Sequence, residues 1–433
     1  MSATVQHPDS LDAPIELAHT ESAAGRRARL STGVLLVVLG VLMGWLGVTA
    51  TSGDARYALS DAFAAVQLPT LSAPGMPTVL LCTVLTLLAG AGFLSGRLWG
   101  RSRAAAAAVA GVAVGLGFVT WAVAGSSQAF PVSNQLSGTI ALATPLVFGA
   151  LCGALGENAG VVNVAIEGQF LTAAFTAALV GSVTRSVPAA LVAAVIAGVL
   201  MGAMLAVFSI KYLVDQVVLG VVINLFASGI TGFMFDQLVQ PNSGELNRVP
   251  PISRLPIPLL SDIPLLGPVL FNQTILVYLA IVSVAVVWFL LYRTRWGLRV
   301  RSVGEHPEAA DTVGINVRLV RWQAVLLGGL FAGLGGAFFT IGSSVSFIKD
   351  ITVGNGFIAL AALIMGRWHP VRAALMALFF GFVSQLGSQL QVLQTPMPSQ
   401  FLLMLPYVAT IIAVAGLIGR SRAPKADGQP YER

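Results

Sequence analysis

Eleven apolar segments, each long enough to cross a lipid bilayer as a helix, constrain this chain more than any other feature of its sequence. A helix satisfies its backbone hydrogen bonds internally, which lipid cannot do for it, so these segments predict membrane-spanning helices. The composition agrees, because 56% of the 433 residues are hydrophobic and only 10% are charged, against roughly 25% in a soluble domain. We therefore predict an all-α, polytopic helical membrane protein. The segments are 32–50, 78–94, 104–124, 138–155, 166–183, 187–209, 216–238, 272–292, 322–342, 371–390 and 399–418.

A twelfth apolar segment, 354–366, is shorter, and its length is compatible with a tilted crossing or with a re-entrant segment. The distribution of basic residues favours a crossing. With twelve crossings and a cytoplasmic N-terminus, 19 of the 24 Lys and Arg residues lie inside and 5 lie outside, which is the expected bias. We predict about 11 to 12 transmembrane segments in the plasma membrane, with both termini cytoplasmic.

The polar ends of the chain and the spacing of its apolar segments predict its organisation. Residues 1–31 are expected to form a disordered cytoplasmic tail that ends in a basic anchor, and 421–433 a second cytoplasmic tail. Residues 32–130 would form an N-terminal extension with about three transmembrane helices. Residues 131–420 would form the core of the protein.

The most charged segment, 293–321, carries six arginines between two apolar segments. Each charge would cost several kcal/mol in lipid, so we expect the segment to protrude into water, on the cytoplasmic side. Its centre predicts one short helix, with Pro307 in the first turn, Glu308 at the positive end of the helix dipole and Gly314 as a stop. An ordinary amphipathic cytoplasmic loop is equally compatible with this pattern.

Residues 156–169 place polar side chains between two apolar segments, without any Lys or Arg. A cytoplasmic loop normally carries basic residues, whereas polar groups inside a membrane usually line a cavity. Discontinuous helices at such a position are a known feature of transporters. A short acidic loop with helix-capping residues is the alternative. The polar side chains are Glu157, Asn158, Asn163, Glu167 and Gln169.

Other spans carry amides, hydroxyls and aromatic rings of the kind that bind a nucleobase or a sugar. An amide can bond a base edge or a ribose hydroxyl, and an aromatic face can stack on a ring. Each of these residues, taken alone, could equally serve in a contact between packed membrane helices. The substrate-path candidates are Glu157, Asn158, Asn163, Glu167, Asn224, Phe226, Phe338, Ser384 and Gln385.

Several functions are not supported by the sequence. The three lysines, Lys211, Lys349 and Lys425, lie outside any GxxxxGK[ST] motif, so no ATPase site is expected in this chain. No span holds a pair of carboxylates and no HExxH is present, so we expect neither a catalytic nor a metal site. The net charge of +6 resides in loops and does not indicate nucleic-acid binding.

Three stretches together resemble a known family: GALGENAGVVNVAIEGQ at 153–169, GLRVRSVGEHPEAADTVGINV at 297–317 and GFIALAALIMGRWHP at 356–370. Over about 138–420 the chain is similar to the permease subunit of bacterial ABC importers, in the ribose and branched-chain amino acid permease family. Within that family it is most similar to the nucleoside branch, which includes purine or guanosine-like permeases.

The resemblance implies that the chain moves a nucleoside across the membrane while partner subunits hydrolyse ATP, so that it needs no cofactor of its own. It implies an ABC ATPase subunit, a second homologous permease subunit in a heterodimer and a substrate-binding lipoprotein. It also implies a coupling helix over 305–317 that contacts the ATPase. The coupling residues would be Glu305, Pro307, Glu308, Ala309, Ala310 and Gly314.

Two alternative transport functions stay open at this point. A permease for a ribose-like sugar would need a similar set of amides and aromatics. A secondary transporter driven by an ion gradient should place an ionisable group within a span. The acids Glu157, Glu167, Asp215 and Asp236 instead fall near span ends, which counts against that alternative. A lipid-modifying enzyme would need clustered carboxylates, and a scaffold would not need the charged segment.

Overall fold

The structure is a computed structural model that describes residues 23–50, 53–60, 66–393, 395, 397–412 and 422–432. Within these residues, ten helices are long and apolar enough to cross a membrane, and two further apolar helices are shorter. The predicted all-α polytopic fold is confirmed. The predicted span 399–418 corresponds to α15 up to Ile412, and its remainder lies outside the described residues.

The helices, π-helical turns and strands follow one another in this order: α1 (Ala23–Ala50), β1 (Asp54–Ala58), β2 (Leu71–Pro74), α2 (Gly75–Ser95), α3 (Gly100–Val123), β3 (Phe130–Pro131), α4 (Val132–Asn158), α5 (Ile166–Thr184), α6 (Val187–Ala206), η1 (Val207–Lys211), α7 (Gln216–Met234), η2 (Phe235–Val239), α8 (Ser243–Leu246), β4 (Arg254–Pro256), η3 (Gly267–Phe271), β5 (Asn272–Thr274), α9 (Ile275–Arg293), α10 (Arg295–Glu305), α11 (Pro307–Thr312), α12 (Val317–Ala337), η4 (Phe338–Ser344), α13 (Asn355–Met365), α14 (Pro370–Val392) and α15 (Ser399–Ile412).

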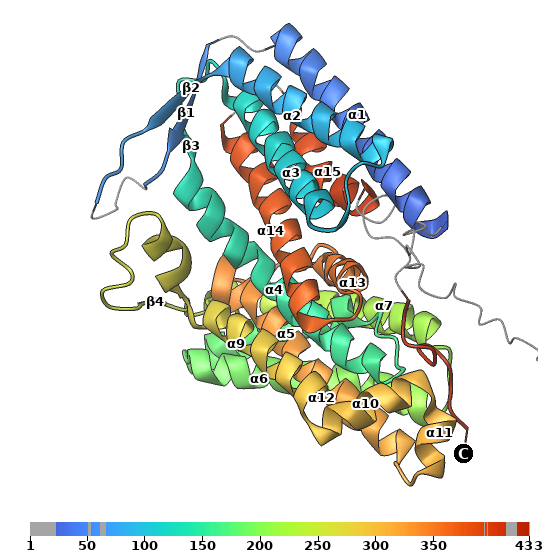
Figure 1. Ribbon diagram of the computed structural model, residues 1–433. Coiled ribbons are helices and arrows are strands. Elements are labelled where there is room, and N and C mark those ends of the chain that lie inside the picture. Colours follow the sequence, from blue (N-terminus) through green and yellow to red (C-terminus); the bar gives the residue numbers. More distant parts are fainter. Residues whose placement is uncertain are drawn as a thin grey trace, which may run out of the picture.

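Helices α1, α2 and α3 form a bundle at one end of the molecule, beside α14 and α15 (Figure 1). A small sheet joins this bundle to the rest of the chain, because β1 pairs antiparallel with β2 and parallel with β3, which leads directly into α4. Buried apolar side chains of the bundle, such as Met43 and Val79, share one cluster with Leu386 of α14 and Leu402 of α15. The extension is therefore packed onto the last two helices.

The core is centred on α4, α6 and α12, and glycines permit its closest contacts. A Cβ added at Gly198 of α6 would lie 2.4 Å from the carbonyl oxygen of Gly329 in α12. One added at Gly333 would lie 2.6 Å from the carbonyl oxygen of Ala194. Gly329 and Gly333 are spaced as a GxxxG motif, and their close contacts with α6 agree with the role of small residues between membrane helices.

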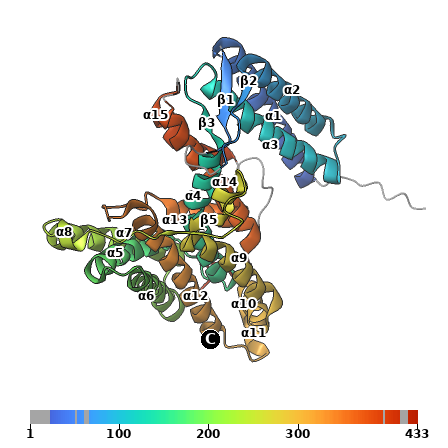
Figure 2. The same ribbon diagram turned by 90° about the vertical axis from the view of Figure 1, so that its left-hand side faces the viewer.

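Helices α10 and α11 lie at the end of the molecule opposite the sheet, and the C-terminus lies beside them; Figure 2 shows the same arrangement from the side. Their arginines identify this end as the cytoplasmic one. The short helix α13 ends near it, since the ring of His369 stacks on that of Tyr292 at a centroid distance of 4.9 Å. The segment 345–354 before α13 is not helical, and α13 alone is shorter than a membrane span.

The two tails differ from the prediction where the structure describes them. Residues 23–31 are the first turns of α1 and not a disordered tail, and residues 1–22 lie outside the described range. The Arg29 guanidinium donates to the carbonyl oxygens of Phe93 (2.6 Å) and Leu94 (2.9 Å), so it binds the C-terminal end of α2. At the other end, residues 422–432 pack against the core, as described below.

Candidate functional site

The N-terminus of α13 is bound by the carboxylate of Glu167. One oxygen accepts hydrogen bonds from the Thr352 hydroxyl (2.5 Å) and the Gly354 N–H (2.8 Å), and the other from the Gly356 N–H (2.6 Å). Gly356 itself is needed for this approach, because a Cβ there would lie 2.5 Å from the Glu167 nitrogen. A carboxylate at this position satisfies the free N–H groups of the first turn and complements the helix dipole.

The C-terminal end of α13 is bound by two residues that precede Glu167 by about ten positions. Glu157, which is buried, accepts a hydrogen bond from the indole N–H of Trp368. Asn158 donates to the Trp368 carbonyl oxygen at 3.0 Å and to that of Ala154 at 2.7 Å. The segment that joins α4 to α5 therefore holds both ends of α13.

The turn before α5 is fixed by two amide side chains. The Asn163 amide donates to Cys152 Sγ and to Gln169 Oε1, both at 3.2 Å. Asn224 of α7 accepts from the Gly168 N–H at 2.8 Å and donates to the Val164 carbonyl at 3.0 Å. The structure thus brings together Glu157, Asn158, Asn163, Glu167 and Asn224, and gives each of them hydrogen bonds within the chain. A direct contact of any of them with a substrate stays a prediction.

The other four substrate-path candidates lie apart from this network. The Phe226 side chain is 48% exposed on α7, whereas Phe338 is buried and contacts Phe339 at a centroid distance of 6.3 Å. Ser384 and Gln385 are partly buried on α14, where the Gln385 amide contacts Gly138 of α4. These residues belong to different faces of the core, and any role in a substrate path remains a prediction for each.

The predicted short cytoplasmic helix is present as α11, but it spans Pro307–Thr312 and not 305–317. Glu305 is the last residue of α10, and Gly314 adopts a φ of 86° in the turn after α11, a conformation that glycine tolerates best. Ala310 is buried in the main core cluster, while Glu308 and Ala309 are exposed. The helix is thus anchored on one side and open to a partner on the other.

Arg321 corrects the expectation that the whole charged segment protrudes into water. Its side chain is 1% exposed, at the first turns of α12. The guanidinium donates to the carbonyl oxygens of Ala159 (3.2 Å) and Gln429 (3.0 Å). It therefore connects the α4–α5 turn to the C-terminal segment 422–432. The signal that sequence reasoning missed is the position of Arg321 at the start of an apolar helix, where burial is possible.

The C-terminal segment 422–432 is held by further contacts with the end of α10 and the residue that follows it. The Ala426 N–H donates to the Gly304 carbonyl oxygen at 2.9 Å, and Lys425 Nζ lies 3.3 Å from His306 Nε2. Tyr431 is buried in the main core cluster. Burial raises the pKa of the Asp427 carboxyl to about 7, against the opposing effect of Arg321. The cytoplasmic tail is therefore a packed element of the core in its described part.

This chain is similar to a family of permease components and to individual permease proteins. The family described as "Branched-chain amino acid transport system / permease component" matches residues 135–414. The guanosine ABC transporter permease protein NupQ of Bacillus subtilis is 41% identical over 312 residues, which cover 69% of this chain and 97% of the relative. The nucleoside ABC transporter permease protein NupC of Lactococcus lactis subsp. cremoris is 40% identical over 298 residues, or 66% of this chain and 93% of the relative.

A putative glucose ABC transporter permease protein of Haloferax volcanii is 31% identical over 326 residues, which cover 70% of this chain and 98% of that protein. No solved structure matches this chain. The matched region begins near the start of α4, so helices α1 to α3 precede it, and the segment 422–432 follows it.

Proposed function

Because the chain belongs to the family of permease components of branched-chain amino acid transport systems, we propose that it is the permease subunit of an ATP-driven importer whose substrate is a nucleoside. The observation that carries the substrate class is the identity of about 40% to two permeases named for guanosine and for nucleosides. A glucose-type relative is more distant, at 31%. A sugar substrate is therefore the second candidate.

In this proposal α11 is the contact with the ATPase subunit. Its exposed residues Glu308 and Ala309 face the partner, and buried Ala310 transmits force to the core. The end of α10 directly abuts the end of α4, because a Cβ at Gly304 would lie 2.1 Å from the Asn158 carbonyl oxygen. Since Asn158 also holds the C-terminal end of α13, a movement of α10 and α11 reaches α4 and α13 through contacts with no free space between them.

The partners follow from the same proposal: an ABC ATPase subunit, a second homologous permease and a substrate-binding lipoprotein. The lipoprotein would dock on the outer loop 239–271, whose strand β4 pairs with β5, just after the loop, with Arg254 opposite Thr274. Seven prolines stiffen this loop. The chain itself performs no chemical step and needs no cofactor, because ATP is hydrolysed by the partner.

The test is uptake of radiolabelled guanosine, uridine and ribose by cells that carry or lack this gene, before and after ATP depletion. We expect deletion to remove ATP-dependent nucleoside uptake and to leave ribose uptake intact. Loss of ribose uptake alone would replace the nucleoside by a sugar. Unchanged uptake of all three would contradict the proposed substrate classes.

Coupling through α11 is tested in the same assay by Glu308→Lys and Gly314→Pro, which change the exposed charge and the turn after the helix. Both variants should reduce uptake at least tenfold while the protein remains in the membrane. Asp54→Lys is the matched control, because Asp54 is an exposed acid on strand β1, outside the proposed docking loop. Normal uptake in both α11 variants would exclude this helix as the coupling element.

A further inference from the structure

A polar surface lies near the middle of the span formed by α7 and η2, and the proposed function assigns no role to its residues. Ser228 lies twelve residues beyond Gln216 and eleven before Val239, the two ends of this span. At about 1.5 Å per residue it is thus about 18 Å from the cytoplasmic end. The Ser228 hydroxyl donates to the Asp350 carboxylate at 2.7 Å. The side chain of Asp350 is exposed.

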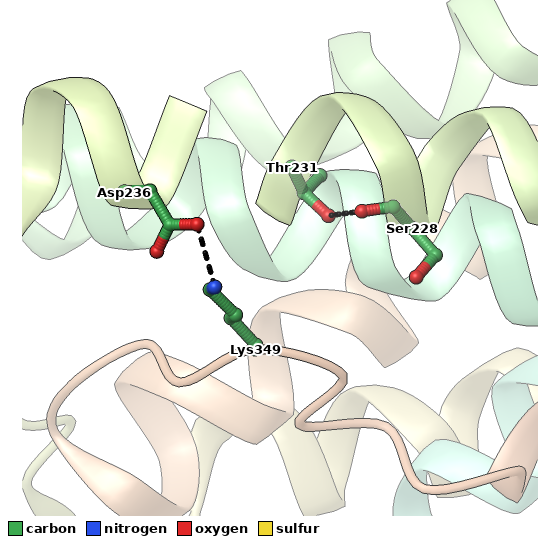
Figure 3. Close-up of polar contacts among 4 residues, drawn as sticks. All are labelled: Ser228, Thr231, Asp236 and Lys349. Carbon is green, nitrogen blue, oxygen red and sulfur yellow. Dashed lines mark hydrogen bonds and ion pairs between the residues drawn. The ribbon is translucent and has the colours of Figure 1, made fainter. Parts of the chain in front are cut away.

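A second polar pair lies next to the first, further toward the outside. Lys349 Nζ lies 2.6 Å from Asp236 Oδ2, and the two side chains are 48% and 42% exposed. In Figure 3, Lys349 extends from the irregular segment before α13 to Asp236. Asp236 and Ser228 both belong to the span formed by α7 and η2. The two pairs therefore join the segment 345–354 to one face of the span.

Among the described residues, no other part of the chain covers this face of α7 at Gly229 and Gly232. A Cβ added at Gly229 or Gly232 would meet no atom of the described residues within 4 Å. The facing segment is irregular, and Val353 adopts a φ of 45° although it is β-branched, a conformation that normally persists only under a functional or packing constraint. Irregular backbone at membrane depth is found only where it is buried in protein or lines a water-filled cavity.

Charged groups at this depth do not face lipid, because lipid offers neither water nor a countercharge. The exposed Asp350 must therefore face an aqueous path, and in the proposed heterodimer that path lies between this chain and the second permease. We propose that Ser228 and Asp350 form this subunit's substrate-binding wall of the path, with Asp236 and Lys349 as its outer neighbours. This inference rests on the proposed function.

The chemistry of the wall selects the ligand class. The Asp350 carboxylate can accept hydrogen bonds from vicinal sugar hydroxyls or a base N–H while the Ser228 hydroxyl holds it in place, because an ionised carboxylate has several acceptor sites. The two carboxylates and one ammonium leave a formal charge of −1 on the wall, which disfavours an anionic ligand. The wall thus fits an unphosphorylated nucleoside with an intact ribose and disfavours nucleotides.

The experiment measures uptake of guanosine and of 2′-deoxyguanosine by cells that carry the complete importer with wild-type chain, Asp350→Asn or Ser228→Ala. The same binding protein delivers both compounds, so a change in the ratio of their rates belongs to this subunit. We expect Asp350→Asn to lower guanosine uptake about tenfold and 2′-deoxyguanosine uptake much less. Ser228→Ala should shift the ratio in the same direction by a smaller factor. Asp54→Asn, at an exposed acid of β1 outside the proposed docking loop, is the matched control and should leave the ratio unchanged.

The outcomes separate this inference from the proposed function. A ratio that shifts in Asp350→Asn but not in Asp54→Asn supports the wall. Equal loss of both compounds, or no loss of either, overturns it, because a purely structural role lowers both rates alike. If the wild-type importer takes up uridine instead of guanosine, the same ratio is measured with uridine and 2′-deoxyuridine. If it takes up no nucleoside, the proposed function itself fails.

Discussion

The polar groups of this protein fall into two regions that differ in how completely the chain satisfies them. Around α13, the carboxylate of Glu167 accepts three hydrogen bonds, and Asn158 bonds two carbonyl oxygens, all within the chain. On the face of α7, by contrast, the Asp350 carboxylate has one hydrogen-bond partner among the described residues, Ser228, and remains exposed. Residues of the first kind fix the positions of helices, whereas those of the second kind are available to a ligand.

The difference separates two roles that the sequence alone does not distinguish. An acid or amide inside an apolar segment indicates function, because placing it in lipid costs free energy. Hydrogen bonds to a helix end can offset this free energy as well as hydrogen bonds to a substrate can. Only the three-dimensional partners decide between these two roles. The acids that the sequence singled out, Glu157 and Glu167, hold α13, while Asp350 was not among the candidates.

The largest effect that would sharpen this comparison is expected for Glu167→Ala. The change leaves the Thr352 hydroxyl and two N–H groups without their acceptor, at a cost of at least about 3 kcal/mol. The melting temperature of the purified protein should fall strongly and uptake should be lost. Asp215→Ala is the control, since Asp215 caps α7 through the Val218 N–H at an exposed site and should cost about 1 kcal/mol.

The two variants also show how the comparison would break. If Glu167→Ala melts like the wild-type protein but transports a changed set of nucleosides, Glu167 contacts substrate and belongs with Asp350. Equal losses of stability in Glu167→Ala and Asp215→Ala would mean that the part-buried cap at α13 contributes no more to stability than the exposed cap at α7.

An intermediate effect is expected for Arg321→Met, which keeps the apolar stem and removes the guanidinium. The buried carbonyl oxygen of Ala159 and the part-buried carbonyl oxygen of Gln429 lose their donor, at a cost of about 2 kcal/mol. Hydrogen exchange of the segment 422–432 should accelerate, because its link to the α4–α5 turn is gone. Arg318→Met, an exposed arginine one turn earlier, should change the stability by less than about 0.5 kcal/mol. Unchanged exchange in Arg321→Met would show that the tail is held without this contact.

The sequence predicts the helices of this fold well, because the length and hydropathy of a span are local properties. Ten of the predicted segments are spans in the structure, and Pro307 and Gly314 mark the limits of α11 as expected. Tertiary partners are not local. Arg318 and Arg321 both lie at the start of an apolar helix, a position that allows burial without showing which of the two is buried. The partners of Glu167 lie more than 180 residues away.

The position of Asp350 shows the same limit from the other side. Lys349 and Asp350 follow a span and are expected in an outer loop, but the chain folds back from there toward α13 before it becomes helical. A polar pair with α7 near mid-depth follows from this path. The fold class and the short helix α11 were thus within reach of sequence analysis, and the polar pairs on α7 were not.

The smallest effect concerns the docking of the C-terminal segment and its dependence on pH. Burial raises the pKa of Asp427 to about 7 from an ordinary value of 3.8, so the docked segment favours the protonated acid. Docking is then strongest below the ordinary pKa and weakens as the pH rises from about 4 through 7. The protection of the Ala426 amide, corrected for intrinsic exchange, should be several-fold greater at pH 5 than at pH 8. Asp427→Asn should remove this dependence and keep protection high at pH 8. Protection that instead rises with pH would mean that attraction between Arg321 and the charged carboxylate outweighs the cost of burying it, and the tail would then be held by an ion pair.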